Sequence, residues 1–339
     1  MNLRVKCLFL LLCCLPLPLM AGGPGACRRA VSYNVENYFD TDNDPLTDDD
    51  EFTPDGPRQW THKRYQTKAA HIAKTLMAVG EGRAPFLVGL CEIENDRVLQ
   101  QLVCRSPLRS AGYCYAHFDS HDPRGIDVAL LYQDSLFHLE DAQTLTVKYS
   151  GSAGSGYGRD ILFAQGVLPQ GERLYVYVCH LPSRINGDRA EAKRCQAMAI
   201  LREHVDGLLR HDPKACILIM GDFNDGPTDR ALLRCLQAEV PAGAASCNGL
   251  YNLAATWRAP VRSQKYQGDW NMLDQIIVSG SLLQPDASVR VLDFKVFTGD
   301  FLLQNDAKWT GVKPYRTYSG QRYIGGFSDH LPVYVDFSW

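Results

Sequence analysis

Nine short apolar segments limit most strongly how this chain of 339 residues can fold. They are rich in Val, Ile, Tyr and Phe and stop at Gly, Asp, Asn or Pro, which predicts β-strands. The predicted strands cover residues 29–35, 86–93, 127–132, 161–169, 173–181, 216–222, 274–279, 289–297 and 331–337. Two segments, 63–79 and 189–209, instead repeat apolar residues at the spacing of amphipathic helices. Strands that outnumber helices, with hairpin-like neighbours, predict two sheets packed face to face with the helices outside.

No repeat, low-complexity tract or linker divides the chain after its first residues, so we expect one domain over residues 28–339. The sequence is 45% hydrophobic and 22% charged, which is ordinary for a globular protein with a sizeable core. Its net charge of -3 argues against a module that only coats nucleic acid. The same net charge is compatible with an enzyme that binds a few phosphates at a local site and then releases them.

Residues 1–22 predict a cleaved signal peptide. Arg4 and Lys6 precede an apolar run over residues 7–20, and small residues follow at 21–23, where a signal peptidase can cut. The apolar run is too short for a comfortable membrane span, so we expect no transmembrane segment in the mature chain. We expect an exported protein, in the periplasm or outside the cell.

Nine of the twelve cysteines lie beyond this signal, and an odd number leaves at least one thiol free or paired between chains. Cys104 with Cys114, and Cys235 with Cys247, are close enough in sequence to pair across loops. No C-x-x-C spacing occurs, which argues against a zinc site.

Six edges of the predicted strands carry acids, amides or histidines, where a buried strand should be apolar. These residues are Asn34 and Glu36, Glu92 and Glu94, His180, Asp222 and Asn224, Asp274, and Asp329 with His330. Each one alone is best explained as a turn or strand-end residue. Six sites together favour a pocket lined by carboxylates, two amides and two histidines.

This inventory suits metal-assisted chemistry on phosphate. Oxygen ligands without cysteine select a hard divalent ion, Mg2+ or Mn2+, with Ca2+ as a further candidate. Such an ion neutralises phosphate oxygens and lowers the pKa of bound water. Asparagine can donate to a phosphate oxygen, and a histidine oriented by a carboxylate can bind phosphate or move protons. The chain has no Walker-type glycine loop and no G-x-S-x-G elbow, so P-loop nucleotide hydrolysis and serine-hydrolase chemistry lack their signatures.

In this order, the six segments resemble the endonuclease/exonuclease/phosphatase superfamily, which includes deoxyribonuclease I, abasic-site endonucleases, neutral sphingomyelinases and inositol polyphosphate 5-phosphatases. The resemblance spans residues 31–339 and is most specific at Asp222-Phe223-Asn224 and Ser328-Asp329-His330. The segments 33–40, 124–127 and 180–184 are similar to an exported bacterial, nuclease-like branch. The resemblance implies a deoxyribonuclease I-like four-layer α/β sandwich, with two mostly antiparallel sheets inside and the site at one end of them.

The resemblance also implies a metal site. By its position in the family motif, Glu92 resembles the principal metal ligand, with Asn34, Asp329 and Glu36 around it. Glu94 lies on the same face of the strand as Glu92. Only the position relative to the family motif favours Glu92 over Glu94 as the ligand.

The catalytic roles follow from the same resemblance. Asp222 matches the residue that orients or deprotonates the attacking water, or assists the leaving group. Asn224 matches the residue that holds a phosphate oxygen. His330, oriented by Asp274, would hydrogen-bond the scissile phosphate. Asp269 is the alternative partner of this histidine, and the Asp-Gln-Ile-Ile-Val-Ser run favours Asp274.

Further phosphate contacts are implied around a second histidine. His180 resembles the second histidine of the deoxyribonuclease I branch, and Asp127 is the candidate for its carboxylate partner. Arg159 matches a phosphate-contacting arginine of that branch. Arg184 opens a cluster of cations and is a further candidate for binding phosphate.

The pocket predicts cleavage of a P–O bond but not the group attached to it. Export, the second histidine and the clustered cations favour nucleic acid, DNA or RNA, as the substrate of a secreted endonuclease. Near the cations, Tyr266, Trp270, Tyr315 and Tyr323 could stack on bases or sugars. The alternative is that these cations are ordinary solvated surface residues and that the aromatic residues belong to the core.

Two other functions stay open. One is a phosphoesterase acting on a sphingolipid, an inositol phosphate or a nucleotide. A membrane-acting enzyme should show an exposed apolar loop, and the sequence has no convincing one. A catalytically inactive binding module is the other, and it should lack one of the central residues. Glu92, Asp222, Asn224 and His330 are all present. We expect a monomer without a stable protein partner.

Overall fold

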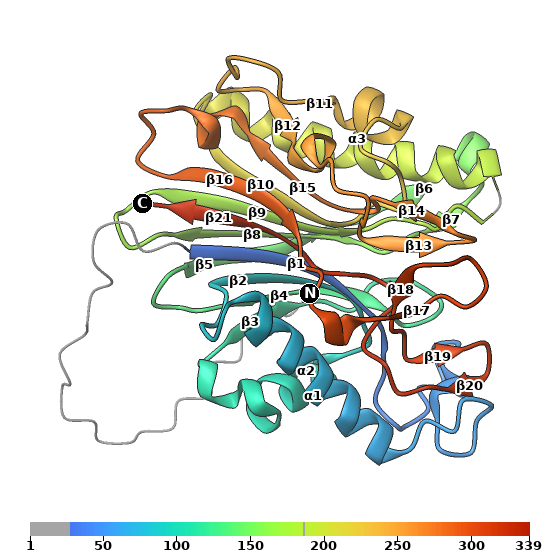
Figure 1. Ribbon diagram of the computed structural model, residues 1–339. Coiled ribbons are helices and arrows are strands. Elements are labelled where there is room, and N and C mark those ends of the chain that lie inside the picture. The colour runs from blue at the N-terminus through green and yellow to red at the C-terminus, as the bar shows by residue number, and fades with distance from the viewer. Residues whose placement is uncertain (1–27, 186) are drawn as a thin grey trace, which may run out of the picture.

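Two β-sheets lie face to face in the computed structural model, which describes residues 28–185 and 187–339 (Figure 1). The first sheet has six strands in the order β16-β21-β1-β2-β4-β3, and the second has seven in the order β11-β12-β15-β10-β9-β8-β5. The neighbours β1–β2, β9–β10 and β11–β12 are parallel, and the other neighbours in these sheets are antiparallel. The predicted signal peptide, residues 1–22, lies outside the described residues.

The strands of the first sheet are β1 (Arg28–Tyr38), β2 (Leu87–Ile93), β3 (Cys114–His117), β4 (Asp127–Tyr132), β16 (Arg290–Val296) and β21 (Val333–Ser338). Those of the second are β5 (His138–Leu145), β8 (Ile161–Val167), β9 (Arg173–His180), β10 (Cys216–Asp222), β11 (Ala238–Glu239), β12 (Leu250–Asn252) and β15 (Asp274–Ser279). Four small pairs complete the strands: β6 (Lys148–Tyr149) with β7 (Gly156–Tyr157), β13 (Gln264–Tyr266) with β14 (Asp269–Asn271), β17 (Leu303–Asn305) with β18 (Val312–Pro314), and β19 (Tyr318–Ser319) with β20 (Arg322–Tyr323).

Helices cover the two outer faces, as Figure 1 shows. α1 (His62–Val79) buries Ile72 and Leu76 against the first sheet, with the short α2 (Asp96–Gln100) beside it. α3 (Gly187–His211) buries Leu201 and Val205 against the second sheet. The layers therefore run helix, sheet, sheet, helix, which confirms the predicted four-layer α/β sandwich.

The largest apolar cluster fills the space between the sheets. Leu218 and Met220 of β10 pack there against residues of β2 such as Leu87 and Cys91. At Gly89 the strands come so close that an added Cβ would lie 3.0 Å from the Met220 side chain. Glycine at this position lets β2 and β10 approach each other. The C-terminal ends of these two strands, which carry Glu92 and Asp222, follow directly after this contact.

Cys104, Cys235 and Cys247 carry free thiols in the structure, so neither of the two loop pairings considered above is formed. Within residues 28–185 and 187–339, no helix is both long enough and apolar enough to span a membrane.

Candidate active site

Three polar side chains stand in a row at one end of the second sheet. Asp222 is the last residue of β10, and it pairs with His180 of β9 on one side and with Asp274 of β15 on the other. Side chains alternate along a strand, and Leu218 and Met220 pack between the sheets, so Asp222 points the same way. The row is buried and faces the first sheet.

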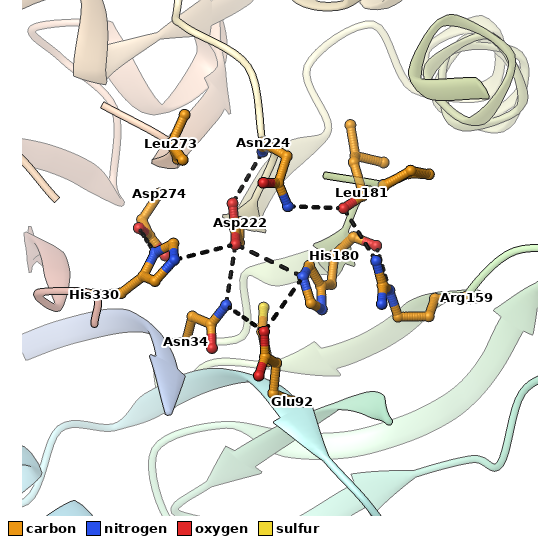
Figure 2. Close-up of polar contacts among 12 residues, drawn as sticks. Asn34, Glu92, Arg159, His180, Leu181, Asp222, Asn224, Leu273, Asp274 and His330 are labelled. Carbon is orange, nitrogen blue, oxygen red and sulfur yellow. Dashed lines mark hydrogen bonds and ion pairs between the residues drawn. The ribbon is translucent and has the colours of Figure 1, made fainter. Parts of the chain in front are cut away.

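Asn34 of β1 and Glu92 of β2 meet this row from the first sheet (Figure 2). Asn34 Nδ2 lies 3.0 Å from Oδ2 of Asp222 and 3.2 Å from Oε1 of Glu92, so one amide bridges two carboxylates. Regular alternation from Leu90, which packs beneath α1, would point Glu92 away from the second sheet. A β-bulge between residues 91 and 93 turns Glu92 toward it instead.

Left-handed backbone conformations gather at the same place. Glu36, Asn37, Glu92 and Asn224 have φ angles of 58°, 53°, 66° and 49°. Such conformations cost about 1–3 kcal/mol each in non-glycine residues and persist where surrounding contacts enforce them. One such contact is the backbone N–H of Asn37, which donates to Oε2 of Glu92 at 2.8 Å. This concentration of strained backbone is typical of a functional site.

His330 reaches the row from the segment that precedes β21. Its Nδ1 lies 2.6 Å from Oδ2 of Asp274, and its Nε2 lies 3.8 Å from Oδ2 of Asp222. Burial would lower the pKa of His330, but the two carboxylates and the hydrogen bond to Asp274 outweigh it and raise the pKa well above its usual value. These contacts favour the protonated form of His330. The structure places Asp274 beside it, whereas Asp269 is exposed on β14.

The pKa of His180 is shifted in the opposite direction. Its Nε2 lies 3.7 Å from Oδ2 of Asp222 and 3.9 Å from Oε1 of Glu92. Burial, together with the positive charges of Arg159 and His330, lowers the pKa of His180 well below its usual value. Two histidines whose pKa values are shifted in opposite directions therefore flank Asp222. Environments that separate two pKa values in this way are typical of acid–base sites.

Asp127 is not the partner of His180, which corrects the prediction made from the sequence. Its Oδ2 accepts the backbone N–H of Ser120 at 3.1 Å, and Nδ1 of His180 has no hydrogen-bond partner among the described residues. Alternation explains the difference, because Asp127 shares its face of β4 with Ala129 and Leu131, which pack on the outer side of the first sheet.

Glu36 is also placed differently from the prediction that it binds metal. Its Oε1 accepts from Nε of Arg316 at 3.0 Å, and its Oε2 accepts the backbone N–H of Thr317 at 2.6 Å. Both oxygens are thus taken by protein donors, because the left-handed turn at Glu36 breaks the alternation that began at Asn34. Arg316 also donates to Oδ2 of Asp329 at 3.1 Å, which leaves Oδ1 of Asp329 free of hydrogen bonds to the described residues.

Asn224 is tied to the row through both its backbone and its side chain. Its backbone N–H donates to Oδ1 of Asp222 at 2.9 Å, and its Nδ2 donates to the carbonyl of Leu181 at 2.9 Å. Arg184, nearly half exposed, donates to the carbonyl of Asn224 and pairs with Asp229, each at 3.0 Å. Arg184 therefore lies at the open edge of the site.

Arg159 supports the strand end that carries His180. It donates to the carbonyls of His180 and Leu181 at 3.0 and 3.2 Å and pairs with Asp122 at 3.3 Å. Its side chain is only 9% exposed. A direct contact between Arg159 and phosphate stays a prediction.

The donor set fits a hard divalent cation. Asn34, Glu92 and Asp329 offer amide and carboxylate atoms, and Glu92 pairs with no lysine or arginine among the described residues, so its charge is available to an ion. Glu94 is instead buried and accepts the backbone N–H of Asp40, which takes it out of the site. Asp222, Asp274 and His330 form a further cluster whose candidate ligand atoms lie within 4.8 Å of one another. Two of these three residues, His330 and Asp274, are already bound to each other by the 2.6 Å hydrogen bond.

Sequence reasoning missed two supporting residues. Arg316 lies in a loop where no periodicity or motif distinguishes it from a solvated cation. Ser263 accepts the backbone N–H groups of Leu273 and Asp274 at 3.0 Å, so it fixes the start of β15. A lone serine in a loop carries no signal for that role.

Solved structures share this fold. The mannosyl-6-phosphatase Bt3783 of Bacteroides thetaiotaomicron aligns with a TM-score of 0.58 at 14% identity, over 92% of this chain and 100% of its own. Truncated TDP2 of Caenorhabditis elegans aligns with a TM-score of 0.55 at 16% identity, over 92% and 98%. The human Nocturnin catalytic domain, with a bound sulfate anion, aligns with a TM-score of 0.54 at 15% identity, over 92% and 94%. At these identities the likeness shows the fold.

None of the curated protein sequences matches this chain significantly. The sequence model of the Endonuclease/Exonuclease/phosphatase family, by contrast, matches residues 30–338. The match covers nearly the whole chain, and the chain therefore belongs to this family, as its motifs predicted.

Proposed function

We propose that this protein hydrolyses phosphodiester bonds with a divalent metal ion and that its substrate is nucleic acid. One observation carries the proposal. The carboxylate of Asp222 lies between His330 and His180, at 3.8 and 3.7 Å, opposite the Asn34–Glu92 pair. These distances exceed a hydrogen bond, so the two rings are not bonded to Asp222 and can contact a water molecule or a phosphate oxygen placed beside all three groups.

Glu92, Asn34 and Asp329 would hold the ion, Mg2+ or Mn2+ with Ca2+ as a further candidate, and when bound it neutralises charge on the phosphate and acidifies water. The carboxylate of Glu92, only 15% exposed and paired with no lysine or arginine among the described residues, supports this assignment. The bulge that turns Glu92 toward the second sheet also places it on the same side as the residues that would handle the phosphate.

Asp222 would take the proton from the attacking water. Asn34 and the backbone N–H of Asn224 hold one carboxylate oxygen each, which fixes the orientation of this base. Water then bonds to phosphorus as the bond from phosphorus to the leaving oxygen breaks. The proton that Asp222 accepted is finally delivered to the leaving oxygen, which ends as a hydroxyl.

His330 would stabilise the charge that grows on the phosphate. Its Nδ1–H donates to Asp274, so the protonated ring presents its Nε2–H to a non-bridging oxygen. Asn224 would donate to a second oxygen, after its Nδ2 exchanges the Leu181 carbonyl for phosphate. Both groups act most strongly in the transition state, so their loss should lower kcat rather than raise KM.

Nucleic acid is the substrate we favour, because the site lies at an open sandwich edge with cations beside it. TDP2 of Danio rerio, a solved neighbour at 16% identity, is described as complexed with a single-strand DNA product. We also propose that the protein is exported, on the strength of its N-terminal sequence. The mannosyl-6-phosphatase neighbour favours a second candidate, a phosphoesterase acting on a small sugar phosphate with the same catalytic residues.

The test uses the purified protein with Mg2+, Mn2+ or Ca2+ and an EDTA control. The substrates are plasmid DNA, RNA, bis-p-nitrophenyl phosphate and mannose 6-phosphate. We expect metal-dependent cleavage of a nucleic acid, and we expect His330→Ala to lower kcat by about 10²- to 10³-fold. His138→Ala is the matched control, since His138 is exposed on the edge strand β5. Hydrolysis of mannose 6-phosphate with nucleic acids untouched would replace the nuclease proposal with the second candidate.

A further inference from the structure

A groove of about 860 Å³ opens beside the catalytic residues, and the chemistry proposed above does not use it. The pairs β13–β14, β17–β18 and β19–β20 form its walls and lie together at the right-hand side of Figure 1. Its lining includes Asp329, and Gln264 at its other wall forms a β-bridge with His330. The groove is therefore continuous with the proposed active site.

Positive charge is concentrated in this groove, although the whole chain has a net charge of -3. Its lining holds five cationic residues against two aspartates, Asp306 and Asp329. The cations are Lys265, Lys308, Lys313, Arg316 and Arg322. Lys265 and Lys313 pair with Asp306 at 3.1 and 3.4 Å, and Arg316 pairs with Asp329. Lys308 and Arg322 form no ion pair with the residues that the structure describes, so both are available to an anionic ligand.

Two exposed aromatic rings lie in the same groove. The exposed fraction is 63% for Tyr266 and 45% for Trp309, which is high for such large apolar side chains. Trp309 is nevertheless held in place. Its backbone N–H donates to Oδ1 of Asp306 at 3.3 Å. Its ring packs against Gly268, where an added Cβ would lie 3.4 Å from the ring. Rigid, exposed rings lose little conformational entropy when a flat ligand stacks on them.

A cation accompanies the Trp309 ring. Nζ of Lys308 lies over that ring, 5.0 Å from its centre. A base that stacks on this face would displace the ammonium, which is then close enough to pair with a neighbouring phosphate. Arg322 lines the groove near Tyr323 of the same strand pair. Ring and charge thus occur next to each other along the groove, as they do in proteins that bind single-stranded nucleic acid.

We infer that this groove binds the nucleotides adjoining the scissile phosphate of a single-stranded polynucleotide, with a base stacked on Trp309 or Tyr266 and a neighbouring phosphate at Lys308 and Arg322. The inference rests on the proposed function and specifies its substrate. A lipid would require an aliphatic surface, whereas the exposed large side chains lining this groove are aromatic. A sugar monophosphate has a single phosphate, which the catalytic residues would already hold.

Binding is measured first, by fluorescence anisotropy of a labelled single-stranded DNA hexanucleotide with Mg2+ present. The protein carries His330→Ala so that the probe stays intact. Adding Trp309→Ala should weaken binding by about 5- to 150-fold, and Trp309→Phe should restore most of it. Adding Arg322→Ala should reduce the slope of log affinity against log salt by about one. Arg210→Ala, an exposed cation near the end of α3, is the matched control and should change neither value.

Turnover separates this inference from the proposed function. In the otherwise wild-type chain, Trp309→Ala should raise KM for the hexanucleotide and leave kcat/KM for bis-p-nitrophenyl phosphate unchanged, because the small diester does not reach the groove. Hydrolysis of the small diester with hexanucleotide binding unaffected by Trp309→Ala and Arg322→Ala would overturn the groove assignment and keep the chemistry. Hexanucleotide binding that depends on Trp309, in a protein that hydrolyses none of the phosphoesters, would support the groove and overturn the proposed function.

Discussion

Nδ1 of His330 lies 2.6 Å from Oδ2 of Asp274, and both side chains are buried at the end of the second sheet. A short hydrogen bond between ionised groups in a buried site is stronger than one between neutral groups. This bond fixes the ring and keeps it charged, so that Nε2–H faces Asp222. Asp274 therefore acts through His330 and is a positioning residue.

Replacing Asp274 by Asn should lower the pKa of His330, because it removes the nearest negative charge while keeping the shape of the side chain. We expect the alkaline limb of the kcat/KM profile to move to lower pH. At pH 8 we expect kcat to fall by no more than the about 10²- to 10³-fold expected for His330→Ala. Asp269→Asn, on exposed β14, is the control and should keep the wild-type profile. An unmoved alkaline limb in Asp274→Asn would show that His330 does not need its charge.

The acid limb of the kcat/KM profile should reflect the ionisation of Asp222. Burial raises the pKa of this carboxyl to about 6, with His330 opposing the shift and Asp274 adding to it. Asp222 must be ionised to accept a proton, so kcat/KM should fall about tenfold per pH unit below pH 6. A profile that stays flat from pH 7 down to pH 4.5 would exclude Asp222 as the base.

The same shift has a consequence for stability. The pKa of Asp222 in the fold lies above its unfolded value, so the folded state binds this proton more tightly and ionised Asp222 costs folding free energy as pH rises through about 6. Asp222→Asn should therefore abolish activity and raise the melting temperature at pH 7.5 in EDTA, by roughly 2–4 °C for each kcal/mol gained. Calorimetry of both proteins tests this, and a lower melting temperature for the variant would contradict the assigned direction.

Glu92 and Glu94 form a matched pair for testing the metal site. Glu92→Gln should raise the Mg2+ concentration for half-maximal activity by at least about 10- to 100-fold, since it removes a ligand charge. Burial raises the pKa of Glu94 to about 8, so it is largely protonated at pH 7 and glutamine resembles its present form. Glu94→Gln should leave both the Mg2+ titration and the melting temperature nearly unchanged. Equal shifts of the Mg2+ titration in Glu92→Gln and Glu94→Gln would contradict the assignment of Glu92, and not Glu94, as the metal ligand.

Strand periodicity predicted much of this architecture. His180 and Asp222 are the last residues of apolar strands and Asp274 is the first residue of another. Alternation along these strands points the three side chains between the sheets, and the structure brings them together. The helices predicted over 63–79 and 189–209 correspond to α1 and α3, because their apolar stripes face a sheet. Strand β5 was missed, since it is an edge strand whose exposed residues are polar and give no apolar run.

Alternation fails where the backbone turns left-handed. Asn34 and Glu36 are two residues apart and should share a face, but the positive φ angles at Glu36 and Asn37 separate them. A bulge has the opposite effect at Glu92, which it brings into the site. Neither conformation is encoded by glycine, so the sequence around these residues carries no local signal for the turn. Contacts from distant segments, such as Arg316 to Glu36, enforce it.

Glu36 gives the sharpest test of the difference between the sequence-based expectation and the structure. If Glu36 were a metal ligand, Glu36→Gln should raise the Mg2+ midpoint as Glu92→Gln does. The structure instead ties Glu36 to Arg316 and Thr317, which adjoin the groove. We therefore expect Glu36→Gln to keep the Mg2+ midpoint within about twofold, with unchanged kcat for bis-p-nitrophenyl phosphate, and to raise KM for the hexanucleotide by about 2- to 10-fold through loss of a charge-assisted hydrogen bond. Parallel Mg2+ titrations of the two variants decide the matter, because a midpoint shift in Glu36→Gln as large as that in Glu92→Gln would return Glu36 to the metal site.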